Sequence, residues 1–442
     1  MKQTASPTQR EPWDALVIGA GPAGSIAAFL LARQGHRVLL VDRSRFPRTK
    51  VCGGCINPAA VEVLKQIGLG DMLHRLHARP TRAFLLTTGR TTSTHALTGG
   101  MAISREAFDQ ALVDEAVAAG AEFRDGCSAT LDAWDGASDS PPSQEGVRGG
   151  SDEHPLLTSD ESEAGLTPSA RPSPGPSLRG RGERVVHLHR DGQTVPVHAK
   201  VILACTGLDA RLLEGEPGLT LRIARRSHMG VSAIAQDAPP AYDAGIIHMI
   251  HGKGGYVGLV RIENGALDIA AALSPAFVKK LGGPAAAVAA ILKRANQPAI
   301  PLIDTLDWHG TPLLTRRRDR VASHRLFVLG DAAGYVEPFT GEGIAWALAS
   351  AQASAPIVHA SIDAWQPAHA ELWNKTHQRL LGSRQRRCRW LTRALRLGPM
   401  VGLANRLLRW VPGLAGPVVR SIQATWQPAT TLDHSLPQGE SR

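Results

Sequence analysis

The residues best suited to chemistry in this chain begin with the glycine-rich motif GAGPAG at residues 19–24. Gly19 permits a tight turn, Gly21 lets a pyrophosphate approach the backbone, and Gly24 lets a helix pack closely on a strand. Asp42 ends the next apolar run, where a carboxylate can accept hydrogen bonds from ribose hydroxyls. An acid at that point suits a free 2′-hydroxyl, so the pattern predicts a site for NAD or FAD rather than NADP.

A second motif, GDAAG at residues 330–334, follows a short apolar strand pattern. Asp331 at the end of that strand can hydrogen-bond a polyol chain. Gly341 and Gly343 then open a helix whose free N–H groups and dipole stabilise negative charge on a ligand. Such charge develops on the N1/O2 edge of a reduced flavin, so the second motif favours FAD.

The two motifs together resemble the FAD-dependent monooxygenases of the p-hydroxybenzoate-hydroxylase fold and the geranylgeranyl reductases that share this fold. The resemblance covers residues 12–135 and 184–360. It implies that Asp331 holds the ribityl chain of FAD. It also implies that Arg105, in a segment similar to the family's R-x-x-F-D, lies near the pyrophosphate or ribose. The alternative for Arg105 is a surface arginine at a helix start.

The segment KVCGGC at residues 50–55 is similar to the Lys-x-Cys-Gly-Gly element of geranylgeranyl-reductase-like flavoproteins. The resemblance implies that its glycines run against the isoalloxazine face, with Lys50 and Arg48 near the flavin or its phosphates. It also accounts for Cys52. The alternative is a redox pair of Cys52 and Cys55, because the C-x-x-C spacing allows a disulfide and lowers a thiol pKa. A zinc site would need a second ligand pair, and the sequence shows none.

The predicted cofactor-binding residues come from these segments and their immediate neighbours. They are Gly19, Gly21, Ala23, Gly24, Asp42, Arg43, Lys50, Cys52, Gly53, Gly54, Arg105, Gly330, Asp331, Pro338, Gly341, Glu342, Gly343 and Ile344. We expect FAD as the cofactor, NAD(P)H or another external donor as the source of electrons, and no metal. Thr206 and Gly207 stand where many hydroxylases of this fold carry Asp-Gly, a pair that serves both FAD and NADPH. The sequence therefore does not identify the electron donor.

The sequence identifies no catalytic side chain, but His248, His251 and Tyr256 are candidates for proton transfer. For the histidines the alternative is a packed or solvated position on a strand. Tyr256 matches the tyrosine of the reductases' Y-x-W-x-F-P motif, whereas Gly258 and Arg261 depart from it. The tryptophan-rich W-x-W-x-I-P pattern of flavin halogenases is absent, which counts against halogenation.

The elements that position these residues indicate an α/β fold: a Rossmann-like FAD-binding domain interleaved with a mostly β substrate domain, plus a C-terminal helical arm. The FAD-binding domain is expected over residues 12–135, with a small β excursion near 80–103, and again over 184–207 and 321–360. Residues 208–320 are expected to form the substrate domain, with a helix over 284–294. Residues 136–183, rich in Gly, Ser and Pro, predict a disordered insertion, and residues 361–430 a basic amphipathic arm.

The net charge of +10 is concentrated in the arm. Residues 375–420 hold 11 Lys and Arg and no Asp or Glu, so the rest of the chain sums to −1 (10 − 11). Apolar helix faces with Trp and flanking arginines suit an anionic bilayer, and we expect contact through residues 384–411. The alternative is a pair of core-capping helices with a solvated basic face. The arm is too apolar for a segment that binds only the phosphate backbone of a nucleic acid, so no nucleic-acid partner is expected.

These features predict an FAD-dependent oxidoreductase that acts on a lipophilic small molecule, by hydroxylation or by reduction of an isoprenoid-type double bond. The Cys-Gly-Gly element favours reduction, and the altered motif at Tyr256 leaves room for a monooxygenase. The alternative from another class is a non-catalytic carrier of prenylated ligands, against which the intact glycine motifs argue. The five sparse cysteines favour a reducing cytoplasm. The basic arm adds the expectation of membrane association at the inner surface.

Overall fold

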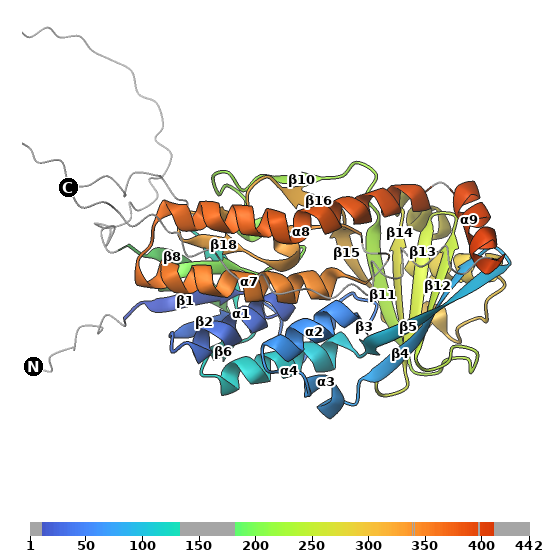
Figure 1. Cartoon of the computed structure of the whole chain (residues 1–442), viewed down its shortest axis with the longest axis horizontal. Helices are drawn as coiled ribbons and strands as arrows, with labels where there is room; N and C mark the ends of the chain where they lie inside the picture. Colours follow the sequence, from blue (N-terminus) through green and yellow to red (C-terminus); the bar gives the residue numbers. More distant parts are fainter. Residues whose placement is uncertain (1–10, 133–181, 338, 340, 397, 411–442) are drawn as a thin grey trace, which may run out of the picture.

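The structure, a computed structural model, describes residues 11–132, 182–337, 339, 341–396 and 398–410. Figure 1 shows an elongated molecule with two halves: the first half holds both glycine motifs, and the second half contains a large second sheet. One long helix, α8 (Pro367–Leu395), runs along both halves. The predicted insertion lies almost wholly outside the described residues, as does the arm beyond residue 410. The predicted α/β class with a C-terminal helical region is confirmed.

The first sheet has the strand order β17-β18-β9-β1-β2-β6, and β8 joins β7 to β9. Its strands are β1 (Trp13–Ile18), β2 (Val38–Val41), β6 (Glu122–Arg124), β7 (Ser128–Leu131), β8 (Arg184–Arg190), β9 (Gln193–Ala204), β17 (Ala322–Ser323) and β18 (Leu326–Val328). β1 runs parallel to β2 and β9, and β18 runs parallel to β9. Central strands of such a sheet are covered on both faces, which is why β2 is apolar at every position and wholly buried.

The helices beside this sheet are α1 (Pro22–Arg33), α2 (Pro58–Gln66), α3 (Met72–Arg75), α4 (Arg105–Ala118) and α7 (Gly343–Asp363). α1 packs on α4 and α7. The start of α4 is fixed by Ser104, whose hydroxyl accepts from the N–H of Ala107 at 3.1 Å. This cap matters for the site because it determines where Arg105, the first residue of the helix, projects.

The second sheet has the order β15-β11-β14-β13-β12-β4-β5-β3. Its strands are β3 (Cys55–Ile56), β4 (Arg79–Thr88), β5 (Thr91–Ala102), β11 (Met229–Ala235), β12 (Ile246–Gly252), β13 (Gly255–Arg261), β14 (Leu267–Leu273) and β15 (His309–Leu313). The β excursion expected near residues 80–103 is present, and β4 pairs in parallel with β12. These residues therefore extend the second sheet, although the sequence places them within the first segment of the expected FAD-binding domain.

Two helices and a small sheet complete the second half. α5 (Pro275–Leu281) is followed by α6 (Pro284–Arg294), which has the bounds predicted from the sequence and packs on β12 and β13. The small sheet joins β10 (Leu221–Ile223), β16 (Arg316–Arg318) and β19 (Gly334–Tyr335). Among the described helices, none alone has both the length and the hydrophobicity of a bilayer span; the sharply bent pair of α5 and α6 meets these criteria only when taken together.

The arm divides into two parts with different surroundings. In α8, Trp373 is fully buried and its Nε1 donates to the carbonyl oxygen of Val328 at 3.2 Å, so the first part of the arm caps the core of the first half. The second helix, α9 (Gly398–Trp410), packs on β4 and β5 at the far end of the molecule. The core-capping alternative therefore describes the start of the arm.

Candidate functional site

A cavity of about 1050 Å³ lies between the two halves. Ile18, Cys205 and Leu329, at the carboxyl ends of β1, β9 and β18, line one side of it, and residues of β11, β13 and β14 line the other. Ligands of open α/β sheets bind beyond the carboxyl ends of the strands. The volume is at the upper end of the range for small-molecule sites, which suits a dinucleotide together with a second ligand.

The three motif glycines have different surroundings. Gly19 has φ +106°, and a Cβ there would lie 2.3 Å from the carbonyl oxygen of Cys205. A Cβ on Gly24 would lie 1.8 Å from the carbonyl oxygen of Gly19, so both positions need glycine for the fold itself. Gly21 lines the cavity, and a Cβ there would meet only the guanidinium groups of Arg48 and Arg105, at 3.6 and 4.0 Å. The free space at Gly21 therefore faces the ligand.

Three cations gather beside Gly21: Arg48, Lys50 and Arg105. Arg105 is held by Asp109, to which its Nε and Nη2 donate at 2.8 and 2.7 Å. Arg48 is buried, and its Nη2 lies 3.1 Å from Asp109. Its Nε forms only a long ion pair with Asp42, at 3.7 Å, and neither Nε nor Nη1 has a hydrogen-bond acceptor. Buried donors without acceptors are costly, so Arg48 fits an anionic ligand such as a pyrophosphate.

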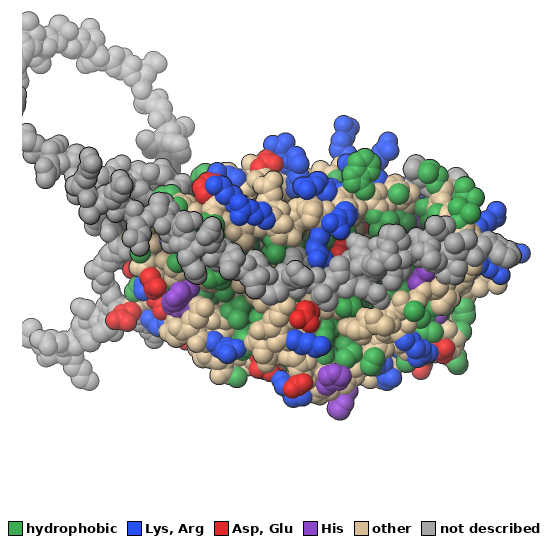
Figure 2. All heavy atoms as spheres, viewed as in Figure 1, with side chains coloured by type: hydrophobic (Ala, Val, Ile, Leu, Met, Phe, Trp, Pro, Cys, Tyr) green, Lys and Arg blue, Asp and Glu red, His purple; other side chains and the backbone are tan. Residues whose placement is uncertain are grey.

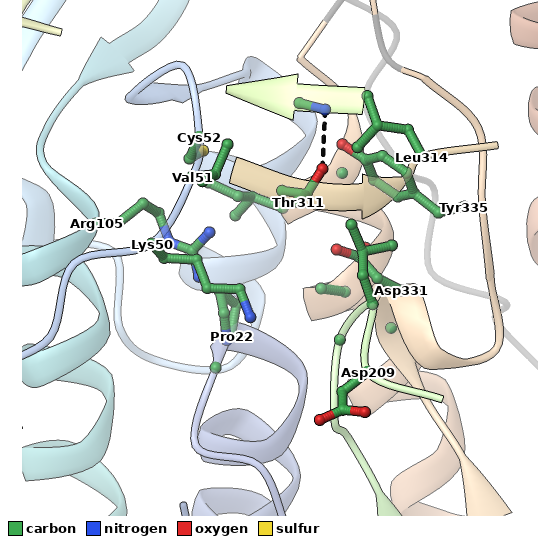
Figure 3. A pocket seen from close by; sticks show the side chains of 18 of the residues that line it. Pro22, Lys50, Val51, Cys52, Arg105, Asp209, Thr311, Leu314, Asp331 and Tyr335 are labelled. Carbon is green, nitrogen blue, oxygen red and sulfur yellow. Dashed lines mark hydrogen bonds between the residues drawn. The ribbon is translucent and has the colours of Figure 1, made fainter. Parts of the chain in front are cut away.

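Lys50 and Asp331 face each other across this part of the cavity, as Figure 3 shows. Burial, followed by repulsion from Arg48 and Arg105, lowers the pKa of Lys50. Burial raises the pKa of Asp331, while Lys50 and Arg105 oppose that rise. The cavity therefore holds an excess of positive charge at the glycine motif and one carboxyl opposite it, which matches a ligand with a phosphate and a hydroxylated chain.

Asp42 lies at the end of β2 on the cavity wall. Its Oδ2 accepts from the N–H of Ala20 at 2.8 Å and its Oδ1 from the N–H of Ser44 at 2.9 Å. Each oxygen retains a lone pair that a ribose hydroxyl can use. Arg43, the next residue, also lines the cavity, and its exposed side chain pairs with Asp209.

The start of α7 forms another part of the wall. Gly341, Gly343 and Ile344 line the cavity. Glu342 does not: it is buried, and the thiol of Cys388 donates to its Oε2 at 2.8 Å. The N–H groups of this first turn give the cavity a second positive end.

Most of the predicted cofactor residues are brought together here. On the cavity wall lie Gly19, Gly21, Ala23, Asp42, Arg43, Lys50, Cys52, Gly53, Arg105, Gly330, Asp331, Gly341, Gly343 and Ile344. Gly24, Gly54 and Glu342 lie behind it, and Pro338 is outside the described residues.

Gly54 is behind the wall because it packs on Asp268 of β14. It has φ +58°, and a Cβ there would lie 2.6 Å from Asp268 Oδ2. Asp268 is almost fully buried, and burial together with Glu263 raises its pKa to about 8, whereas Arg105 opposes the shift. Sequence patterns give no sign of this carboxyl, because an aspartate within an apolar strand looks like a solvent-facing position.

Cys52 and Cys55 both line the cavity as free thiols. Burial is the first cause that raises the pKa of each, and Asp268 adds to the rise. Both sulfurs are therefore held in the thiol form, which is the unreactive one. Within the described ranges, no three His, Cys, Asp or Glu side chains are grouped so that they could hold a metal ion.

The part of the cavity next to the second sheet is apolar and aromatic. Its wall includes Met249, Tyr256, Leu314, Tyr335 and Phe339. The rings of Tyr256 and Phe339 meet edge to face with centroids 5.1 Å apart. A ligand in this part must be largely apolar.

Tyr256 is tied to a buried acid. Its hydroxyl is hydrogen-bonded to Glu337, whose Oε1 lies 2.8 Å from Nδ1 of His228. Burial, followed by Glu337 and Tyr335, raises the pKa of Tyr256 well above its ordinary value. Glu337 and His228 were not predicted from the sequence, because three separate segments contribute to this chain of groups.

His248 and His251 are not on the cavity wall. Ile247 and Met249 of β12 face the cavity, so His248 points to the opposite face, where its ring packs on Tyr242. His251 is covered by the end of α8, and its Nε2 lies 2.7 Å from the carbonyl oxygen of Leu395. Burial lowers the pKa of both. Of the three predicted candidates, only Tyr256 therefore reaches the cavity.

Comparison with known proteins supports FAD as the ligand of this cavity. Residues 13–140 match a family described as "FAD binding domain". The chain is 41% identical over 113 residues to a geranylgeranyl diphosphate reductase from Rhodobacter capsulatus, covering 25% of this chain and 27% of that protein. A menaquinone reductase from Mycobacterium tuberculosis is 53% identical over 60 residues (14% and 15%). A squalene monooxygenase from Rattus norvegicus is 31% identical over 73 residues (16% and 13%). Each of these matches spans less than a third of the relative's own length.

Solved structures share the fold over nearly the whole chain. A p-nitrophenol 4-monooxygenase from Pseudomonas putida is 14% identical, with a TM-score of 0.65, covering 93% of this chain and 96% of that one. A flavin-dependent brominase is also 14% identical, with a TM-score of 0.67, covering 93% and 94%. The predicted fold and the predicted cofactor are thereby confirmed. The chain therefore contains an FAD-binding domain, and over nearly its whole length it shares the fold of these solved structures.

Proposed function

We propose that this protein uses FAD to reduce a carbon–carbon double bond in a lipophilic, isoprenoid-type small molecule. The observation that carries the proposal is the single cavity, which joins a cationic glycine-lined end to an apolar, aromatic end. The segment match to a geranylgeranyl diphosphate reductase and the match to a menaquinone reductase support a lipophilic substrate.

The cationic end fits the cofactor. Arg48 and Lys50 would hold the pyrophosphate, Asp331 the ribityl chain, and Asp42 the adenosine ribose. Bound there, FAD would supply the two-electron chemistry. The apolar walls exclude water from the reacting bond, and the ring pair of Tyr256 and Phe339 orients an unsaturated chain against them.

Reduction of a double bond consumes a hydride, which bound and reduced FAD would supply, and a proton, which the protein must supply. Tyr256 and Tyr335 both lie on the apolar wall, and burial raises the pKa of each phenol, so both stay protonated. We assign the proton transfer to Tyr256 because its hydroxyl is hydrogen-bonded to Glu337, which in turn contacts His228. After transfer of its proton to the substrate carbon, Tyr256 regains one through Glu337 from His228. His228 is partly exposed, so solvent can restore its proton.

The test is anaerobic turnover of isoprenoid diphosphates and quinones with chemically reduced, FAD-loaded protein, followed by mass spectrometry. We expect a saturated product in the absence of oxygen. Tyr256→Phe should keep FAD and lose turnover, whereas Phe277→Tyr, on the other side of the sheet, should leave turnover unchanged. Absence of a saturated product from every substrate class would contradict the proposal.

Hydroxylation is the second candidate, favoured by the match to a squalene monooxygenase. It predicts that turnover requires oxygen and that the product gains an oxygen atom derived from O₂.

A non-catalytic carrier of prenylated ligands predicts protein without flavin absorbance even after FAD is added. The electron donor is proposed to be NAD(P)H or another external reductant, and consumption of NADH and NADPH can be measured in the same assay.

A further inference from the structure

The helix α9 presents an apolar stripe to solvent while a polar side chain anchors it to the protein. Met400, Leu403 and Leu407 recur at helical spacing, with 63%, 60% and 51% of their surfaces exposed. On the opposite side, Asn405 is fully buried, and its Nδ2 donates to the carbonyl oxygen of Leu86 at 3.1 Å. A surface helix normally turns its apolar stripe inward, so this stripe implies an external partner.

The end of α8 adds an exposed tryptophan among arginines. Trp390 is 70% exposed, and the guanidinium of Arg393 lies 5.6 Å from its ring centroid. Arg386 is one helical turn away and also exposed. Figure 2 shows hydrophobic and basic side chains together along the edge formed by this end of α8 and by α9. No Asp or Glu occurs between residues 372 and 432, so this end of α8 and all of α9 contribute only positive charge to the edge.

The arginines at this edge repel one another. Burial, followed by Arg317, Arg386 and Arg393, lowers the pKa of Arg389. Two more exposed arginines, Arg406 and Arg409, lie on α9. An anionic partner would relieve this repulsion, whereas a second copy of the chain would bring two positive edges together and increase it.

We propose that the face formed by Trp390, Met400, Leu403 and Leu407 with the flanking arginines docks on an anionic lipid bilayer. Tryptophan and aliphatic side chains enter the interfacial layer, and the arginines bind the lipid phosphates. We refer to this surface as the α8–α9 face. Of the eight large hydrophobic side chains that are exposed within the described residues, four belong to it.

The cavity opens beside this face. Ile223 of β10 lines the cavity and is itself 47% exposed. β10 pairs with β16, and Arg317 of β16 is among the arginines that act on Arg389 of α8. A docked protein would therefore hold the mouth of the cavity near the bilayer, where a lipophilic substrate resides. This last step rests on the proposed function, whereas the docking itself does not.

The experiment is flotation of the FAD-loaded protein with vesicles of phosphatidylcholine alone and with vesicles that also contain phosphatidylglycerol. We expect binding to the anionic vesicles, weakened by salt, and little binding to the neutral ones. The triple variant Met400→Ser/Leu403→Ser/Leu407→Ser should lower the partition coefficient at least tenfold. Neutralising Arg406 and Arg409 as glutamine should lower it by roughly fivefold per residue.

A matched control removes three exposed apolar side chains from other surfaces, as Val117→Ser/Val195→Ser/Leu302→Ser. It should bind vesicles as the parent does. All variants should retain bound FAD and the parent's unfolding midpoint, because the changed side chains are exposed. Equal binding by the α9 variant and the parent, or an equal loss in the control, would overturn the proposal. So would sedimentation showing that the α9 variant has lost self-association instead. No turnover is measured, so a failed reductase assay leaves this result unaffected.

Discussion

Gly21 and Gly24 are separated by two residues, yet substituting each by alanine should affect different properties. In the folded protein Gly21 has φ −81° and ψ −176°, which any residue adopts, and its added methyl would touch only two guanidinium groups at 3.6 Å or more. We expect the FAD-free Gly21→Ala protein to unfold within about 1 kcal/mol of the parent, since a poorer N-cap and a stiffer unfolded chain offset each other.

The same methyl occupies the space through which a pyrophosphate reaches the N–H groups of α1. Loss of two hydrogen bonds to a charged group costs about 3–6 kcal/mol, or roughly 10²- to 10⁴-fold in the Kd for FAD. Gly24→Ala should do the reverse, because its methyl would lie 1.8 Å from a backbone carbonyl oxygen and destabilise the fold by about 3 kcal/mol or more.

The assay pairs urea unfolding of the FAD-free variants with FAD titration followed by flavin fluorescence. If Gly21→Ala binds FAD as tightly as the parent, the assignment of the cationic end of the cavity to the pyrophosphate is wrong. If it loses FAD only because it no longer folds, the distinction between the two glycines is wrong instead.

Three further predictions concern charged groups. Asp331→Ala should keep the fold and weaken FAD by roughly 10- to 150-fold, the equivalent of one charge-assisted hydrogen bond; an unchanged titration would remove Asp331 from the site. Folding raises the pKa of Asp268 from 3.8 to about 8, so the contribution of this group to stability is complete below pH 3.8 and is lost as the pH rises towards 8. Between these values the free energy of unfolding should fall by up to about 1.4 kcal/mol per pH unit, and Asp268→Asn should abolish this slope. If the stability–pH curves of the variant and the parent are parallel, Asp268 is not buried as a protonated acid. Arg184→Met leaves the carboxylate of Glu216 buried without its arginine partner, because both side chains are only 3% exposed. It should lower the free energy of unfolding, measured in urea, by about 3–5 kcal/mol. The control Arg45→Met, at an exposed ion pair, should lower it by less than about 1 kcal/mol.

The sequence predicted those parts of the site in which one short segment determines its own geometry. Gly19 and Gly330 have positive φ, and Gly24 sits against backbone, so glycine at each is required by local structure and visible as a motif. The strands before the motifs were predictable for a similar reason, because a parallel strand covered on both faces is apolar throughout.

Long-range pairing could not be predicted in the same way. Nothing local to residues 79–102 indicates that β4 lies parallel to β12, some 160 residues later in the chain. In β12 the alternation of side chains between the two faces of the strand follows from the sequence, but which face meets the cavity depends on the neighbouring strands. For this reason the sequence could not show that Met249 lines the cavity and His248 does not. His251 shares the face of Met249 and is still excluded, because the end of α8 covers it.

The arm connects the α8–α9 face, where we propose docking on lipid, to the apolar end of the cavity, and this connection decides which variants can test either proposal. Thr392 Oγ1 donates to the backbone carbonyl oxygen of Glu337. Arg396, the residue that follows α8, donates to the Glu337 carboxylate, which is also hydrogen-bonded to Tyr256. Removing the arm would leave Glu337 buried with fewer partners, a change that costs several kcal/mol and disturbs the apolar end of the cavity. Loss of activity after truncation would therefore not identify a membrane contact. Exposed side chains of α9 can be changed without touching Glu337, so only such substitutions separate docking on lipid from the positioning of Tyr256.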